Sequence, residues 1–423
     1  MPLFWDKLAG WTSIHDTFIT LYANQPGAFW LDREHHPTAR FSVMGVGVET
    51  NQLPSFREQD ADLPFAFRPG VVGAIHYSNS AKDISNTSLL KVDRALVYDH
   101  DTKAIYFVAD LESRKEFDDW HRAALLRLAL TGGGAASHEL NFPAATAAEL
   151  VAEDDKQTYL QKISTAQQHI AAGDVYQLCL TTRLRGEYVG DPLSFFLRLR
   201  KQHPAPYSCF MRIGEKTIVS ISPELFISVH NGRVISSPIK GTRKRSSDQE
   251  QDRKLIEELG ADPKERAENL MIVDLIRNDL SAVCEPSSVA VESLLAVRSY
   301  STVHQLVSDV SGQLAEGASP LDALRALFPG GSMTGAPKEK AMEIIRELES
   351  SQRDVYSGAI GYITAGLEME LGMVIRTAVF DKDTVSIGIG GGITSDSQPE
   401  SEHEEIQLKA IALASVLGAR VRW

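Results

Sequence analysis

The chain has 423 residues, 43% of them hydrophobic and 23% charged, and this ordinary composition excludes a collagen-like, coiled-coil or wholly disordered protein. Its 43 lysines and arginines are outnumbered by 56 aspartates and glutamates, so the formal net charge is −13. An acidic chain disfavours nucleic acid and anionic membranes as partners, although a local basic segment can still bind an anionic ligand. Its 3 scattered cysteines are too few for a disulfide framework and favour a reducing compartment.

No segment has the features of a targeting or membrane-spanning sequence. The N-terminus carries Asp6 and Lys7 and lacks the apolar run of a signal peptide. The longest apolar stretch, 410–419, is far shorter than the roughly 18 residues that a membrane helix needs. We therefore expect a cytoplasmic protein with no membrane partner.

The first part of the chain is predicted to form short strands and one helix. Apolar patterns bounded by turn signals predict a helix at 112–129 and strands at 40–48, 71–77, 94–98 and 104–109. A glycine- and alanine-rich stretch without periodicity follows at 131–137. We place a boundary here and predict an N-terminal region, 1–148, that ends in a flexible crossover over 131–148, and a catalytic domain, 149–423.

The second part contains clusters of strands interrupted by helices. Helical spacing predicts helices at 154–172, 264–277, 319–327, 338–348 and 402–417. Extended segments are predicted at 175–183, 207–213, 216–220, 225–230, 233–236, 289–301, 302–311, 358–364, 369–380 and 384–391. Because the strands cluster and do not alternate strictly with helices, they favour the α+β class with largely antiparallel sheets.

Two glycine-rich segments resemble nucleotide-binding motifs but fail in detail. The segment 330–338 has the glycines of a phosphate loop, but Ala336 stands where the motif requires lysine. In 388–393, Ile393 replaces the third glycine of a dinucleotide-binding fingerprint. Neither segment supports a nucleotide enzyme. No cysteine lies in a nucleophile-elbow context, so the chain also lacks an obvious glutamine-hydrolysing site.

A basic segment just past a predicted strand is the first candidate for chemistry. Four cations fall within six residues of this acidic chain: Lys240, Arg243, Lys244 and Arg245. A free lysine, with a pKa of about 10.4, is mostly protonated at neutral pH, so a nucleophilic lysine must be desolvated or crowded by cations. The three neighbouring cations can supply such crowding for Lys240, although a solvated basic turn is the commoner explanation of a charge run.

Two predicted helices carry pairs of carboxylates. Glu265 and Glu268 are three residues apart, so both side chains emerge on one helix face. Glu404 and Glu405 lie on the closing helix, with Lys409 beyond them. Each pair alone is typical of an exposed acidic first turn. If the two helices meet, their carboxylates can hold one Mg²⁺ that binds an anionic substrate group.

Several blocks of residues occur in an order typical of one enzyme family. They are 222–224 (SPE), 239–242 (IKGT), 265–279 (ERAENLMIVDLIRND), 303–306 (VHQL), 335–338 (GAPK), 356–362 (YSGAIGY), 375–376 (IR) and 388–393 (GIGGGI). In these blocks the chain resembles the chorismate-utilising enzymes, from about residue 154 to the C-terminus. The resemblance implies an anthranilate synthase component I-like fold, with two largely antiparallel sheets packed together and flanked by helices. The region that binds tryptophan in related enzymes cannot be matched, so we predict no effector site.

Two positions favour one branch of the family. By resemblance, the anthranilate, isochorismate and salicylate synthases have alanine at the position of Lys240, whereas the aminodeoxychorismate synthases have lysine. At Gln177 the water-using members have a lysine that activates water. Glutamine cannot act as a general base, so ammonia, which is already nucleophilic, is the better-suited attacker. We therefore expect the activity of aminodeoxychorismate synthase component I, a transferase that converts chorismate and ammonia to 4-amino-4-deoxychorismate for p-aminobenzoate and folate biosynthesis.

The resemblance also implies roles for individual residues. Lys240 would attack C2 of chorismate, Glu224 would be the acid and later the base, and His304 would lie at the reacting ring. Mg²⁺ would bind Glu268 and Glu405, with Glu265 as a direct or water-bridged helper. The substrate would be bound by Thr242, Thr334, Lys338, Tyr362, Arg376, Gly390, Gly391 and Gly392.

Two alternatives stay open. Anthranilate synthase component I shares the fold and would release pyruvate. A non-catalytic chorismate-binding relative is disfavoured because Lys240, Glu224 and His304 are all present.

Where several family members have a second acidic ligand or helper on the last helix, this chain has Leu408. The resemblance further implies a separate glutamine amidotransferase subunit (component II) that delivers ammonia.

Overall fold

The computed structural model of the chain describes residues 2–8, 10–36, 39–57, 62–130 and 143–423. These residues form two large sheets whose strand pairs are antiparallel apart from β23 with β9. The first sheet has the order β1 (Leu3–Leu8), β8 (Ala104–Asp110), β7 (Arg94–Asp99), β3 (Phe41–Val46), β2 (Ala28–Asp32), β11 (Tyr207–Ile213), β12 (Lys216–Ser222), β21 (Thr377–Asp381), β22 (Thr384–Ile393), β10 (Gln177–Glu187), β9 (Glu149–Ala152) and β23 (Arg420–Arg422), and β18 (Gly335–Ala336) pairs with β10. The second has the order β15 (Ile239–Lys244), β17 (Val303–Gln313), β14 (Arg233–Ser237), β13 (Leu225–His230), β20 (Met369–Met373), β19 (Ala359–Thr364), β5 (Gly70–Ile75), β6 (Thr87–Val92) and β4 (Val48–Thr50), and β16 (Ala290–Ser299) pairs with β17.

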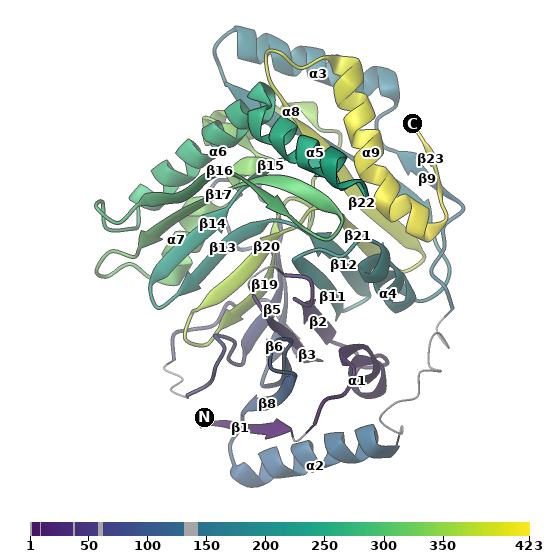
Figure 1. Ribbon diagram of the computed structural model, residues 1–423, viewed down its shortest axis with the longest axis vertical. Coiled ribbons are helices and arrows are strands. Elements are labelled where there is room, and N and C mark those ends of the chain that lie inside the picture. Colours follow the sequence, from purple (N-terminus) through teal and green to yellow (C-terminus); the bar gives the residue numbers. More distant parts are fainter. Residues whose placement is uncertain (1, 9, 37–38, 58–61, 131–142) are drawn as a thin grey trace.

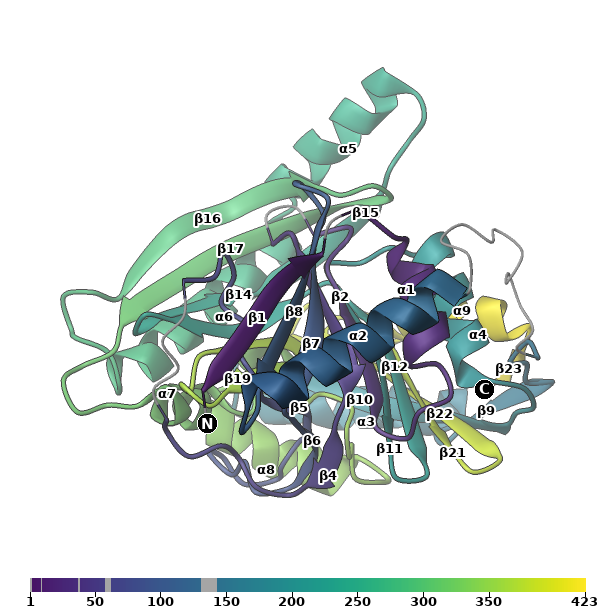
Figure 2. The same cartoon turned by 90° about the horizontal axis from the view of Figure 1, so that it is seen from below.

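Helices cover the outer faces of both sheets, and the two inner faces pack against each other (Figure 1). The first sheet carries α1 (Ile14–Leu21), α2 (Arg114–Leu130), α3 (Lys156–Ala171), α4 (Pro192–Gln202), α8 (Lys338–Leu348) and α9 (Pro399–Leu417). The second carries α6 (Pro263–Ser281) and α7 (Pro320–Leu327), while α5 (Gln249–Ala261) projects beyond β15 (Figure 2). Apolar side chains fill all three interfaces, so the molecule has four layers with separate cores between them. The predicted α+β class is confirmed.

The N-terminal region contributes strands to both sheets. Before residue 148, β2 pairs with β11 and β5 pairs with β19, both of which come from the later part of the chain. The division into 1–148 and 149–423 stays a prediction. The predicted flexible crossover lies outside the described residues as far as residue 142, and Ala144 and Thr146 form isolated bridges to Asp191 and Val189.

Two predictions about single elements are wrong. The segment 369–380, predicted as one strand, forms β20 in the second sheet and β21 in the first. The chain changes sheets at Arg376, which has a left-handed φ of 49° without being glycine, so no turn residue marked the break. The basic segment after Ser237 was expected to follow a strand, but it is itself the edge strand β15. Helices α1, α4 and α5 were not predicted at all.

Two chain crossovers between the sheets lie side by side and position the site. One joins β12 to β13 through Glu224, and the other joins β20 to β21 through Arg376. The backbone N–H of Met373 donates to the carbonyl of Glu224 at 3.0 Å, and that of Ile221 donates to the carbonyl of Arg376 at 3.1 Å. The packing of the sheets therefore brings the crossover segments of Glu224 and Arg376 next to each other. No helix among the described residues is long and apolar enough to span a membrane.

Candidate active site

Lys240 lies on β15 beneath α6. Its Nζ is 3.5 Å from Oε2 of Glu268, and the two side chains are 13% and 7% exposed. Gly241, the next residue, has a φ of +80° at a β-bulge, and a Cβ there would lie 2.8 Å from Cδ1 of Leu259 and 3.0 Å from Cδ of Glu265. The left-handed φ and the nearby side chains of α5 and α6 therefore favour glycine at this bulge.

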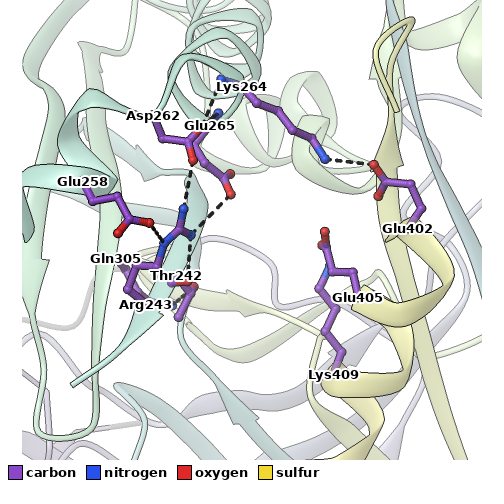
Figure 3. Close-up of polar contacts among 10 residues, drawn as sticks. All are labelled: Thr242, Arg243, Glu258, Asp262, Lys264, Glu265, Gln305, Glu402, Glu405 and Lys409. Carbon is purple, nitrogen blue, oxygen red and sulfur yellow. Dashed lines mark hydrogen bonds and ion pairs between the residues drawn. The ribbon is translucent and has the colours of Figure 1, made fainter. Parts of the chain in front are cut away.

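The charge environment of Lys240 differs from the expected one. Burial disfavours its ammonium form, but the nearby groups Glu268, Cys179 and Glu224 favour it, and its pKa is raised above the ordinary value. Two of the three cations expected to keep it neutral are paired with other carboxylates, and the third is exposed. Arg243 Nη2 is 2.9 Å from Oδ2 of Asp262, and Arg245 Nη2 is 2.7 Å from Oδ2 of Asp252; the side chain of Lys244 is exposed (Figure 3 for Arg243). The predicted crowding by these three cations is therefore wrong.

Glu224 is a buried carboxyl group that can exchange a proton near neutral pH. Burial raises its pKa to about 7, against the opposing effects of Ser332, the charge of Lys240 and the N–H of Ile239. Glu224 and Ser332 line one small cavity, whose walls also include Ser236 and Met373. A pKa near the working pH is the property that a general acid or base needs. Ser332 was not predicted, because only the fold places its glycine-rich turn opposite Glu224.

Gln177 begins β10 and is fully buried. Neither its Oε1 nor its Nε2 has a hydrogen-bond partner among the described residues. Leaving a buried polar group unpaired costs about 1–3 kcal/mol, so this amide is available to a polar ligand. Gln177 and Cys179 point to the same face of β10, and Cys179 is the register partner of Gly392. A Cβ at Gly392 would lie 3.4 Å from Nζ of Lys240 and 3.0 Å from Oε2 of Glu268, so a side chain there would fill the space beside them.

Side chains of the two acidic helices reach each other, as the hypothesis of a shared metal site requires. Burial and the charges of Glu268, Glu405 and Asp262 raise the pKa of Glu265, so carboxylates of α6 and α9 lie within electrostatic range of one another. Lys264 of α6 donates a 2.8 Å hydrogen bond to Oε1 of Glu402 on α9 and joins the two helices (Figure 3).

The prediction that Glu404 belongs to the acidic pair of α9 that faces α6 is wrong. Glu404 is exposed, whereas Glu402 is 2% exposed and accepts hydrogen bonds from Lys264 and Ser397. Glu402 and Glu405 are spaced three apart, like Glu265 and Glu268, so both face α6. Tertiary packing sets the rotation of α9 about its own axis, and this rotation decides which glutamates face α6.

The residues present fit Mg²⁺ by their chemistry, since carboxylate oxygens are the ligands it prefers. No group of three potential ligands within the described ranges is already close enough to hold a metal ion. A reason is visible: Lys240, Lys264 and Lys409 each pair with one carboxylate, those of Glu268, Glu402 and Glu405 respectively. A bound cation would therefore share these carboxylates with the ammonium groups or displace them.

His304 is fully buried on β17, on the same face of the sheet as Lys240. Its Nδ1 is 2.8 Å from Oγ of Ser299, and its Nε2 is 2.9 Å from Oδ1 of Asp252. Both ring nitrogens thus have partners within the protein. The predicted contact of His304 with the reacting ring stays a prediction.

Among the predicted substrate ligands, Arg376 is best suited to bind an anion. Its side chain is largely buried, burial lowers its pKa, and no carboxylate among the described residues forms an ion pair with it. A guanidinium without an anionic partner, placed beside the segment of Glu224, can bind a carboxylate through two parallel hydrogen bonds.

Other predicted substrate ligands already have partners. Lys338 pairs with Asp279 at 2.6 Å, and the hydroxyl of Thr334 donates to the carbonyls of Gly330 and Gly331. Further contacts involve Thr242 with Gln305 (3.3 Å), the Gly390 carbonyl with Lys409 (2.9 Å), and the ring of Tyr362 with that of Phe67 (5.3 Å between centroids). Gly391 lies beside the carboxylates of α9. Substrate contacts by these residues stay predictions.

Comparison with known proteins identifies the class to which this fold and site belong. Residues 11–415 match the family of chorismate binding enzymes, and the chain belongs to that family. It is 40% identical to the aminodeoxychorismate synthase of Streptomyces griseus over 379 residues, which are 87% of this chain and 52% of that protein. It is 36% identical to aminodeoxychorismate synthase component 1 of Salmonella typhimurium over 372 residues, 85% of this chain and 78% of that protein. The chain thus spans about half the length of the Streptomyces protein.

The fold agrees with a solved structure of the same family. The crystal structure of anthranilate synthase component I from Streptococcus pneumoniae matches with a TM-score of 0.77 and 28% identity, over 89% of this chain and 92% of that chain. The predicted anthranilate synthase component I-like fold is therefore confirmed.

Proposed function

We propose that this chain acts as aminodeoxychorismate synthase component I and converts chorismate and ammonia to 4-amino-4-deoxychorismate. The observation that carries the proposal is the buried Lys240, which lies within electrostatic range of Glu224 and Glu268. A lysine in this position supplies a nucleophile that an alanine cannot supply. The similarity to proteins named aminodeoxychorismate synthase supports the same branch.

In the first proposed step, Lys240 acts as a nucleophile. Its ammonium form cannot attack, so it first transfers a proton to a base, and we assign this role to Glu224, whose pKa is about 7. The amine then forms a bond to C2 of chorismate, the ring double bond shifts, and the C4–O bond breaks. Glu224 returns the proton to the departing hydroxyl, which leaves as water.

In the second proposed step, ammonia attacks C4. The double bond shifts back, the bond between C2 and the lysine nitrogen breaks, and the free amine of Lys240 is restored. The unpaired amide of Gln177 can accept a hydrogen bond from ammonia without removing a proton from water. We propose that a separate glutamine amidotransferase component supplies this ammonia.

Substrate binding uses the groups around the reacting ring. Arg376 would bind one carboxylate of chorismate as a two-point ion pair. Glu268 and Glu405 would hold Mg²⁺. Glu265 and Glu402 belong to the same group of electrostatically interacting side chains and would assist directly or through water. When bound, the ion would supply positive charge that neutralises the second substrate carboxylate.

Product analysis tests this function and its rival. The purified chain is incubated with chorismate, Mg²⁺ and ammonium, and we expect 4-amino-4-deoxychorismate without pyruvate. The structural match to anthranilate synthase component I makes that activity the second candidate. Pyruvate formed in step with turnover would overturn our proposal and favour the anthranilate synthase activity. Loss of all product in Lys240→Ala supports covalent capture, whereas anthranilate or isochorismate from this variant would show that the lysine only selects the reaction branch.

A further inference from the structure

Arg353 is a buried guanidinium that has no part in the proposed reaction steps. It follows α8, its side chain is 2% exposed, and its Cζ lies 4.5 Å from the ring centroid of Tyr77. Its Nε and Nη2 donate to the two carboxylate oxygens of Glu349 at 2.9 and 2.7 Å. The pair therefore has the two-point geometry of a strong ion pair.

The same guanidinium also binds two backbone carbonyls. Nη1 donates to the carbonyl of Met333 at 2.5 Å, and Nη2 donates to that of Cys179 at 2.7 Å. Met333 lies between Ser332 and Thr334, and the N–H of Cys179 donates to the Thr334 carbonyl at 2.7 Å. One side chain thus joins the turn 331–334 to strand β10.

Glu349 strengthens this connection from the other side. Its Oε1 accepts hydrogen bonds from both the backbone N–H and the hydroxyl of Thr181 on β10, each at 2.8 Å. Only an arginine can serve all these acceptors together, because its planar fork carries five N–H donors, whereas lysine has one ammonium group. The donors of Arg353 therefore suit a role in holding the turn 331–334 in place against β10.

The parts that Arg353 connects both face the candidate site. The turn carries Ser332, which lines the small cavity with Glu224, and β10 begins at the unpaired amide of Gln177. Gln177 in turn pairs with Ala336, just beyond the turn. No hydrogen bond or ion pair joins the Arg353 side chain to Glu224, Gln177 or Lys240 in the described part of the chain, so any effect on them passes through the backbone.

We infer that Arg353 is a positioning residue, which together with Glu349 fixes the turn 331–334 against β10 and so orients Ser332 toward Glu224. The catalytic consequence rests on the proposed function, whereas the placement of the turn does not. The two residues are replaced together, because removing only one of them would leave an uncompensated buried charge.

The test uses the double variant Arg353→Met/Glu349→Met, with Arg353→Lys measured in parallel. Amide hydrogen exchange in a peptide covering 330–336 should accelerate at least about tenfold without chorismate. The kcat should fall about 10–100-fold, because small misplacements of reacting groups have effects of this size, while KM changes less. The midpoint of the pH profile of kcat should also move upward, because Ser332 holds down the pKa of Glu224.

A matched control removes another buried ion pair. Arg33 Nε is 2.8 Å from Oε1 of Glu370, and Arg33→Met/Glu370→Met should leave exchange in 330–336 unchanged. Wild-type exchange and an unshifted pH profile in the Arg353 variants would overturn the inference. If the double variant does not fold, the same two measurements on Arg353→Lys decide. Failure of the wild-type chain to form 4-amino-4-deoxychorismate would contradict the proposed function instead, and the exchange measurement would still decide the placement of the turn.

Discussion

Lys240 and Glu268 face each other at the junction of β15 and α6, with Nζ 3.5 Å from Oε2. The ammonium that is proposed to become the nucleophile therefore lies against a carboxylate that is proposed to bind Mg²⁺. This contact stabilises the charged form of Lys240 and raises its pKa, although burial acts in the opposite direction. Any change at Glu268 should consequently affect both the lysine and the binding of a cation.

Glu268→Gln should weaken Mg²⁺ binding by at least about tenfold, because an amide keeps the shape of the side chain but lacks its negative charge. Isothermal titration calorimetry with MgCl₂ measures the affinity without substrate. Glu404→Gln is the matched control, since Glu404 is exposed on α9, and this variant should bind as the wild type does. Equal affinities for the two variants would exclude Glu268 as a ligand.

Glu224 should make the free energy of unfolding depend on pH. Because the folded pKa of about 7 is raised, the buried carboxyl group contributes most stability below its unfolded pKa, and this contribution is lost as pH rises through about 7. The loss should amount to about 3 kcal/mol between pH 4 and pH 8. Urea unfolding of the wild type and of Glu224→Gln measures it: the difference between them should change by this amount, and a constant difference would contradict the raised pKa.

Gly241→Ala should destabilise the protein more than alanine at an open left-handed position. Both Gly241 and Gly317 have positive φ, 80° and 83°, so each substitution carries backbone strain of about 1–2 kcal/mol. At Gly241 the new Cβ would also meet Leu259 and Glu265, whereas at Gly317 nothing lies within 4 Å. The free energies of unfolding of the two variants should differ by roughly 1–3 kcal/mol because of this overpacking. Equal losses would show that the bulge has room for a side chain.

Arg376→Ala should lower kcat/KM for chorismate about 10–100-fold, since hydrogen bonds to a charged group contribute about 1.5–3 kcal/mol. Most of the change should appear in KM if the guanidinium binds a carboxylate equally in the ground state and the transition state. The control is Arg346→Ala, an exposed arginine on α8, which should leave both constants unchanged. Unchanged kinetics in Arg376→Ala would remove it from the substrate site.

The amino-acid sequence by itself determined the class of the fold, most helices of the second part and the identity of the family. These features depend on local periodicity and on residue types at fixed spacings, which are present in the chain before it folds. Lys240, Glu224, Gln177 and Glu268 could be named because the residue blocks around them resemble those of the chorismate-utilising enzymes.

Only the tertiary structure decided which charges remain available at the site. It paired Arg243 and Arg245 with carboxylates, and it left Arg376 without one among the described residues. It also turned Glu402 rather than Glu404 toward α6, and it placed Ser332 opposite Glu224. Such relationships depend on the phase and packing of elements far apart in the chain, and Coulomb energies vary with distance and burial. Residue spacing within one segment contains neither quantity.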